Sequence, residues 1–352
     1  MYEKFLEMEN HIMTAAEIYL GTYAKDSEEG IVRYRLADHG ALEKTGVWNG
    51  INRPSWLLMS ERKNMLYAVQ ELAPCGAIVA YSISDGQLKK EAQLSTEGAN
   101  PCHLSMDDKQ EFLFAANYSS GSLAVYRLNE KGVPLCLSHL VRHHGHGPNE
   151  LRQDGPHVHF SKFYRDELYV VDLGVDTIFR YSLDRDQGIL FDTGRNIKFP
   201  DGAGPRHLIF SPVHPGIMYV IAELSSSVFT VDISTQNGKI LDSQSMLPED
   251  FHGATKAAAI KLNDDSSLLF ASSRGHDSIA VYEVLENGLL CLRGIYGCGG
   301  KSPRDIEAIG KDLFIANQDS DRLTVMNIDT SSADFGRTRV VAELTKPVCI
   351  CR

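Results

Sequence analysis

Residues 202–223 read GAGPRHLIFSPVHPGIMYVIAE and hold two short apolar runs joined by a turn rich in Pro and Gly. Two such runs predict an antiparallel β-hairpin. Antiparallel partners begin and end side by side, so Arg206, near the start of the first run, is expected beside Glu223, at the end of the second. The hairpin therefore brings a guanidinium and a carboxylate to one rim.

The second run of this hairpin recurs along the whole chain. Its seven copies are IYLGTY (18–23), LYAVQE (66–71), LFAANY (113–118), LYVVDL (168–173), MYVIAE (218–223), LFASSR (269–274) and LFIANQ (313–318). An alternating run follows each copy, a weaker run comes after that, and a run opened by Pro precedes most copies, although the one before 269–274 has lost its Pro and reads KAAAIKL. Four short strands per unit of roughly 50 residues predict an all-β, seven-bladed β-propeller.

The two ends of the chain are expected to share one blade. The first copy lacks a Pro-led run before it, and a run of that kind, KPVCICR (346–352), stands alone at the other end. We expect this C-terminal strand to complete the N-terminal blade and close the ring. Composition shows no break, so residues 18–352 are predicted to form a single domain, with residues 1–17 as a tail or short helix.

Composition excludes several classes of protein. A net charge of −11 argues against a nucleic-acid partner, which needs a clustered basic surface. Neither a membrane span nor the apolar core of a secretory signal is present, so no membrane partner is expected. The seven cysteines include no CxxC pair, which favours reduced thiols and a cytoplasmic location. The alternation of Cys349 and Cys351 is typical of buried strand residues.

Polar residues gather where the first strands begin and the second strands end. The layer is predicted to contain Ser55, Cys102, His157, Arg206, Arg304 and Val348 from first strands, and Tyr23, Glu71, Tyr118, Leu173, Glu223, Arg274 and Gln318 from second strands. Buried charges persist when they are paired or functional. Singly, Arg206 and Glu223 could be a structural ion pair, His157 a core histidine and Glu71 an interblade hydrogen-bond partner. Their convergence favours a functional site.

The connection at residues 142–159, RHHGHGPNELRQDGPHVH, contains five His and three Gly. A His-rich run is compatible with a metal site. No carboxylate stands at ligand spacing, so a polar lid over the site is the favoured interpretation.

GAGPRH, AELSSSVFTVD (222–232), MLPEDF (246–251) and SPR (302–304) together resemble the seven-bladed lactonase family, over essentially residues 18–352. That family holds bacterial 6-phosphogluconolactonase and fungal carboxy-cis,cis-muconate cyclase. The resemblance implies that His157, Arg206, Glu223 and Arg274 are catalytic. Lys256 departs from the pattern, because many bacterial members carry Trp there, and the substrate-facing wall is therefore expected to differ.

The implied reaction is hydrolysis of a sugar lactone, 6-phosphogluconolactone in the pentose phosphate pathway, without metal or cofactor. Glu223 or His157 would activate water, and Arg206 would face the oxyanion. Arg274, with Arg304, would hold a phosphate. Glu71, Tyr118, His159 and Arg304 are expected to contact the substrate. Two alternatives stay open: a carboxymuconate-type cycloisomerase, and a non-catalytic propeller that binds a protein partner.

Overall fold

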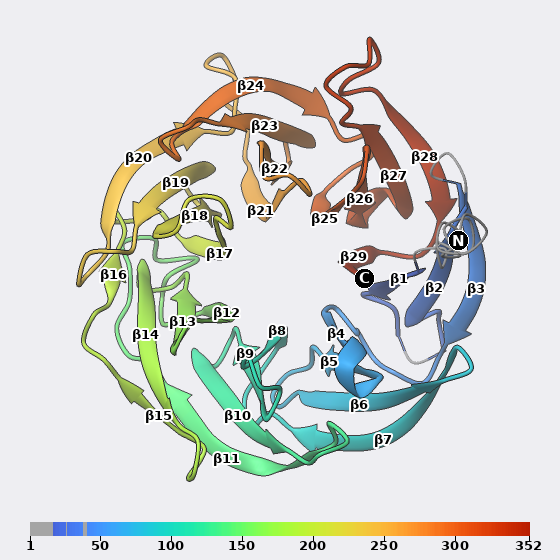
Figure 1. Ribbon diagram of the computed structural model, residues 1–352, viewed down its shortest axis with the longest axis vertical. Helices are drawn as coiled ribbons and strands as arrows, with labels where there is room; N and C mark the ends of the chain where they lie inside the picture. Colours follow the sequence, from blue (N-terminus) through green and yellow to red (C-terminus); the bar gives the residue numbers. More distant parts are fainter. Residues whose placement is uncertain (1–16, 26, 38–40) are drawn as a thin grey trace, which may run out of the picture.

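The computed structural model describes residues 17–25, 27–37 and 41–352. Its strands form a ring of seven antiparallel sheets around a central axis (Figure 1). The predicted all-β, seven-bladed propeller is confirmed. The tail or short helix predicted for residues 1–17 lies almost wholly outside the described residues, because β1 begins at Glu17.

Each blade runs outward from the axis through four strands. The innermost are β4 (Leu57–Ser60), β8 (Pro101–Met106), β12 (Val158–Tyr164), β17 (Pro205–Phe210), β21 (Lys256–Leu262), β25 (Pro303–Ile309) and β29 (Pro347–Cys351). The second are β1 (Glu17–Thr22), β5 (Met65–Gln70), β9 (Phe112–Asn117), β13 (Glu167–Asp172), β18 (Ile217–Ala222), β22 (Leu268–Arg274) and β26 (Asp312–Asn317).

The outer half of each blade is more exposed. The third strands are β2 (Ile31–Leu36), β6 (Ala77–Ser84), β10 (Ser122–Leu128), β14 (Thr177–Asp184), β19 (Ser227–Asp232), β23 (Ser278–Val284) and β27 (Arg322–Asn327). The fourth are β3 (Leu42–Trp48), β7 (Gln87–Ser95), β11 (Pro134–Arg142), β15 (Ile189–Asp192), β20 (Lys239–Ser245), β24 (Leu290–Gly297) and β28 (Thr338–Glu343). A short strand, β16 (Ile197–Lys198), also pairs with β14, and two 3-10 turns, η2 (Glu61–Lys63) and η3 (Gln318–Ser320), complete the described elements.

The ring closes as predicted. β29 pairs antiparallel with β1, and the sheet order is β29-β1-β2-β3. Cys349 and Cys351 are buried in this strand, and all seven cysteines are unpaired thiols. In the described part of the chain, no helix is long and apolar enough to cross a membrane.

Apolar contact between neighbouring blades holds the ring together. Seven hydrophobic clusters lie in the core, each shared by two adjacent blades. The aromatic residue that recurs in every second strand is at most 3% exposed: Tyr19, Tyr67, Phe114, Tyr169, Tyr219, Phe270 and Phe314. Truncating a residue of this kind to Ala typically costs about 3–5 kcal/mol. The aromatic residue that recurs in the sequence is therefore a recurring residue of the hydrophobic core between blades.

A β-bulge recurs where the innermost strands begin. In β17, Pro205 pairs with Ala222 and His207 with Ile221, so Arg206 is an extra residue without a cross-strand partner. The same shift occurs in β8, β12, β21, β25 and β29. Before β4, the bonds from Val69 N to the Trp56 carbonyl and from Glu71 N to the Arg53 carbonyl leave two residues opposite one. Bulges re-aim side chains at such positions.

Candidate functional site

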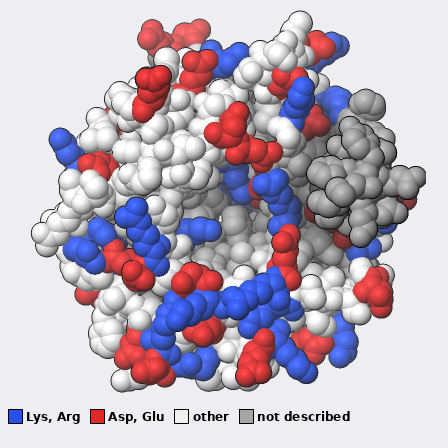
Figure 2. Space-filling view, in the orientation of Figure 1, with Lys and Arg blue, Asp and Glu red and all other residues white. Residues whose placement is uncertain are grey.

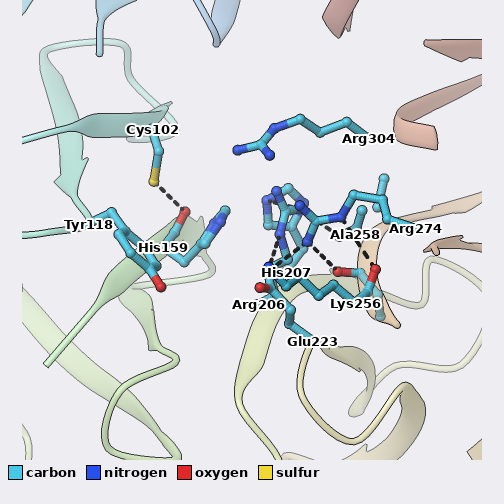
Figure 3. Close-up of polar contacts among 12 residues, drawn as sticks. Cys102, Tyr118, His159, Arg206, His207, Glu223, Lys256, Ala258, Arg274 and Arg304 are labelled. Carbon is cyan, nitrogen blue, oxygen red and sulfur yellow. Dashed lines mark hydrogen bonds and ion pairs between the residues drawn. The ribbon is translucent and has the colours of Figure 1, made fainter. Parts of the chain in front are cut away.

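One end of the ring collects the bulge residues, and we call it the mouth. The bulge residues there are Ser55, Cys102, His159, Arg206, Ala258, Arg304 and Val348. The ends of the second strands surround them. In each blade one residue at that end lies level with the start of the inner strand: Tyr23, Glu71, Tyr118, Leu173, Glu223, Arg274 and Gln318. Figure 3 shows several of these side chains converging from different blades.

The register predicted for His157 is wrong. Val158 pairs with Asp172, and the carbonyl of His157 accepts a bond from Leu173 N, just as the carbonyl of Gly204 does from Glu223 N. His159 therefore occupies the position of Arg206 in its blade. Aligning the blades on their Pro residues misplaced the histidine by two residues, because Pro156 precedes its strand whereas Pro205 begins one.

Glu223 is the most heavily paired carboxylate at the mouth. It is 3% exposed and accepts hydrogen bonds on Oε2 from Arg206 Nε at 3.1 Å and Arg274 Nη2 at 2.9 Å. Oε1 accepts from Arg152 Nη2 at 2.6 Å. The predicted proximity of Arg206 and Glu223 is confirmed. The sequence did not reveal that arginines from two further segments also reach this carboxylate.

Local backbone geometry fixes Glu223. Gly204 adopts a φ of +63°, and a Cβ there would meet Leu224 Cγ at 2.5 Å. This conformation presents the Gly204 carbonyl to Glu223 N at 2.7 Å, while Asp176 Oδ1 accepts from Gly204 N at 2.7 Å. The Gly-Pro-Arg sequence at 204–206 therefore requires glycine at its first position, because this backbone conformation holds the Glu223 carboxylate in place.

The arginines keep Glu223 ionised. Burial by itself would raise the pKa of this carboxyl, but the positive charges of Arg274 and Arg206, with smaller contributions from His159 and Arg152, lower the pKa far below its usual value of 4.5. Both oxygens of Glu223 already accept hydrogen bonds from arginines, so a proton added to this carboxylate would have to displace an ion pair.

Arg152 is a site residue that the sequence reasoning missed. It comes from the connection at residues 143–157, which we call the mouth loop, and its Nη2 also donates to Tyr118 Oη at 3.1 Å. Its Nη1 is buried and has no hydrogen-bond partner. Glu223 raises the pKa of Arg152 although burial opposes this, so the side chain stays charged.

Two buried contacts anchor the mouth loop. Gln153 is fully buried and donates from Nε2 to the Leu173 carbonyl at 2.9 Å. His143 is 6% exposed, with Nδ1 at 2.6 Å from Asp172 Oδ2 and Nε2 at 3.0 Å from Tyr181 Oη. Both ring nitrogens are thus engaged, and no group of three or more His, Cys, Asp or Glu residues in the described ranges is arranged to hold a metal ion.

His159 is a neutral imidazole with free hydrogen-bonding capacity. It is 4% exposed, and its Nδ1 has no partner. Burial, followed by the charge of Arg206, lowers its pKa well below the usual 6.5. Its ring lies edge-on to Tyr118, with centroids 5.6 Å apart (Figure 3). Unlike Glu223, it can accept a proton without first losing an ion pair.

His157, by contrast, packs against the wall of the site. Its ring stacks on Tyr118 with centroids 4.4 Å apart. Nδ1 lies 3.1 Å from the Tyr118 carbonyl and Nε2 lies 3.3 Å from Asp154 Oδ1. Its ring nitrogens are therefore engaged, and its position supports Tyr118 and the mouth loop.

Arg304 belongs to a second polar cluster at the mouth. Its Nη2 donates to Tyr23 Oη at 2.6 Å, and Tyr23 Oη donates to Glu71 at 2.9–3.0 Å. Ser55 also donates to Glu71. The interblade hydrogen bond considered for Glu71 is present. Arg304 has no direct carboxylate contact among the described residues, whereas Arg274, expected to hold a phosphate with it, is bonded to Glu223.

The mouth carries more positive than negative charge. The guanidinium groups of Arg152, Arg206, Arg274 and Arg304 lie in the two polar clusters at the centre of the mouth, together with the carboxylates of Glu223 and Glu71. These clusters hold four cations against two anions in a protein of net charge −11. A local surplus of this kind attracts an anionic ligand.

The chain resembles known proteins in sequence over nearly its whole length. The family described as Lactonase, 7-bladed beta-propeller, matches residues 17–351. The chain is 31% identical over 342 residues to a 6-phosphogluconolactonase of Bacillus subtilis, covering 94% of this chain and 97% of that protein.

Two solved structures share the ring. The Pseudomonas aeruginosa periplasmic gluconolactonase has a TM-score of 0.87 and 27% identity, covering 95% of this chain and 98% of its own. A protein from Lactobacillus plantarum has a TM-score of 0.86 and 29% identity, with the same two coverages.

Proposed function

The chain belongs to the lactonase family of seven-bladed β-propellers, and from that premise we propose that it hydrolyses 6-phosphogluconolactone to 6-phosphogluconate. The name of the Bacillus subtilis relative and the cationic surplus at the mouth support a phosphorylated lactone. The seven unpaired cysteines support a cytoplasmic site of action.

In the proposed reaction, water adds to the carbonyl carbon of the lactone and the ring C–O bond breaks. His159 accepts a proton from the attacking water and returns it to the leaving ring oxygen, which becomes a hydroxyl. This assignment replaces the earlier pair of candidates, Glu223 and His157. The observation that carries it is the unpartnered Nδ1 of a neutral, buried histidine at the mouth.

The arginines would divide between the reacting carbonyl and the remote phosphate. Arg206 and Arg274, which both donate to Glu223, would stabilise the oxyanion that forms as water adds. Arg304 lies in the other cluster and would hold the phosphate, with Lys256 at the rim. Preorganised charges need no rearrangement when the transition state forms.

The test is hydrolysis of fresh 6-phosphogluconolactone, recorded by pH-stat against its spontaneous opening. His159→Asn is expected to lower kcat by about 10²–10⁴, the usual contribution of a general base. His157→Asn is the matched control, with a loss below about tenfold because that ring only supports Tyr118. A larger loss for His157→Asn than for His159→Asn would overturn the base assignment, and a wild-type protein without activity on any sugar lactone would overturn the function.

Phosphate recognition is tested with gluconolactone as the unphosphorylated partner. Arg304→Met is expected to raise KM for the phosphorylated lactone by about 10–100-fold, since one charge-assisted hydrogen bond is lost. Turnover of gluconolactone should stay close to that of the wild type. Equal losses on both substrates would place Arg304 at the reacting carbonyl instead.

A further inference from the structure

The axis of the ring holds a second chamber that the lactonase site does not use. A cavity of about 540 Å³ lies at the end of the inner strands away from the mouth, and we call it the lower chamber. Its size falls within the range of small-molecule sites. Figure 2 shows one face of the molecule, where the ring is hollowed at its centre and both basic and acidic side chains lie around the hollow.

A layer of rings separates the lower chamber from the mouth. Trp56, His103, Phe160 and His207 each follow the bulge in consecutive blades. Their successive ring centroids lie 4.3, 4.0 and 4.9 Å apart. The same four side chains line the lower chamber, so its floor is largely aromatic. A ligand bound there would lie on the far side of this layer from Glu223 and His159.

The next inward-facing layer supplies charge. Lys162 and Lys261 occupy the same position in β12 and β21, and Glu307 occupies it in β25. Lys261 Nζ lies 2.5 Å from Glu307 Oε2, and Arg352 Nε lies 3.5 Å from Glu307 Oε1. The one carboxylate in the lining is therefore already neutralised.

Lys162 is left without a counter-ion. In the described part of the chain, no carboxylate lies within ion-pair distance of it, although its equivalent, Lys261, is paired. Lys162 is exposed to solvent and lines the cavity, so its ammonium group is open to a ligand. An anion that entered the chamber would form a charge-assisted contact with it.

We propose that the lower chamber is a second binding site, for a small aromatic carboxylate whose anionic group pairs with Lys162 and whose ring packs on the Trp56–Phe160 floor. Lys261 and Arg352 are paired with Glu307, and Arg352 also lies 3.6 Å from Asp264, so Lys162 is the lining cation to which an anion would bind. The aromatic floor favours an apolar, planar body. The site is distinct from the catalytic mouth and does not depend on the proposed lactonase reaction.

The probe is 4-fluorobenzoate, titrated into the full-length Trp48→Phe protein. This substitution leaves Trp56 as the single tryptophan, because the chain contains two. Saturable change in Trp56 fluorescence is expected, together with broadening of the probe's fluorine resonance. Lys162→Met should weaken binding by about tenfold or more, the effect of losing one charge-assisted contact. The uncharged analogue 4-fluorobenzyl alcohol should bind the Trp48→Phe protein more weakly than 4-fluorobenzoate does, by a similar factor.

Two further variants make the test decisive. Lys239→Met removes an exposed lysine from the outer strand β20 and should bind the probe like the Trp48→Phe parent. Arg152→Met alters the mouth and should also leave the titration unchanged. The proposal is overturned if the probe shows no saturable binding, if Lys162→Met binds with the parent's affinity, or if Arg152→Met rather than Lys162→Met abolishes binding.

Discussion

Replacing Glu223 with Gln removes one negative charge from the centre of the mouth while keeping the shape of the side chain. The three arginines that donate to it are 3%, 12% and 26% exposed at the side chain for Arg206, Arg274 and Arg152. Two of them therefore have little access to solvent that would replace the lost carboxylate. The change should destabilise the protein and displace the arginines that the proposed reaction uses.

The expected loss of stability follows from the burial of the ion pairs that Glu223 makes. Breaking a buried ion pair by removing one partner costs about 3–5 kcal/mol. For 352 residues the entropy of unfolding near 60 °C is about 0.7 kcal/mol/K, so the expected fall in Tm is about 4–7 °C. Partial exposure of Arg152 favours the lower end. The matched control is Glu43→Gln, which breaks an exposed pair with Arg35 and should shift Tm by about 1 °C or less.

The pH dependence gives a second readout. The folded pKa of Glu223 is lowered from 4.5, so its stabilisation is fully present above about pH 4.5 and is lost as the pH falls toward the folded pKa. The difference in Tm between wild type and Glu223→Gln should stay constant from pH 5 to 8 and shrink below about pH 4.5. Thermal melts followed by circular dichroism measure both quantities. A Tm within 1 °C of wild type at pH 7, or a difference that stays constant down to pH 3, would refute the reasoning.

Other consequences can be tested in the same way. Deleting residues 346–352 should open the β1–β29 pairing, expose strand edges and cause aggregation in light scattering; a soluble, cooperatively melting truncation would contradict the clasp. Burial raises the pKa of Asp305 to about 6, so its stabilisation is present below about pH 3.8 and is lost as the pH rises through 6. Asp305→Asn should therefore gain stability relative to wild type between pH 4 and 8, by up to roughly 3 kcal/mol, and a pH-independent difference would argue against this shift. Lactonase activity should survive EDTA, and a loss reversed by zinc would bring His143, His144 and His146 back as ligands. Arg152→Met should raise KM for 6-phosphogluconolactone while Tm changes by less than in Glu223→Gln, because two arginines still pair with the carboxylate; unchanged kinetics would remove Arg152 from the site.

The fold could be predicted because each blade contains the same short sequence pattern. Each copy of the 218–223 run carries the same aromatic residue of the interblade core, and the unmatched strand at 346–352 required a partner. The contact between Arg206 and Glu223 was predictable for a similar reason, since it lies within one hairpin.

The other parts of the site depend on distances that no local pattern records. Arg274 reaches Glu223 from the neighbouring blade, and Arg152 reaches it from a loop whose path depends on the burial of Gln153. The position of His159 depends on the cross-strand pairing of its neighbours, Val158 with Asp172 and Phe160 with Val171, and a Pro-based alignment cannot report that pairing. One signal was available. A buried carboxylate beside one arginine, in a layer with more positive than negative side chains, indicates that further cationic side chains contact it.

The recurring bulge allows the side chains at the mouth to change during evolution while the strands of the scaffold keep their pairing. Each blade contributes one residue that makes no cross-strand pair, so its side chain can change without shifting the register of the remaining strand. The present occupants include a serine, a cysteine, a histidine, two arginines, an alanine and a valine. These seven positions form a compact set for a combinatorial library, in which new specificities could be selected while the interblade core stays untouched.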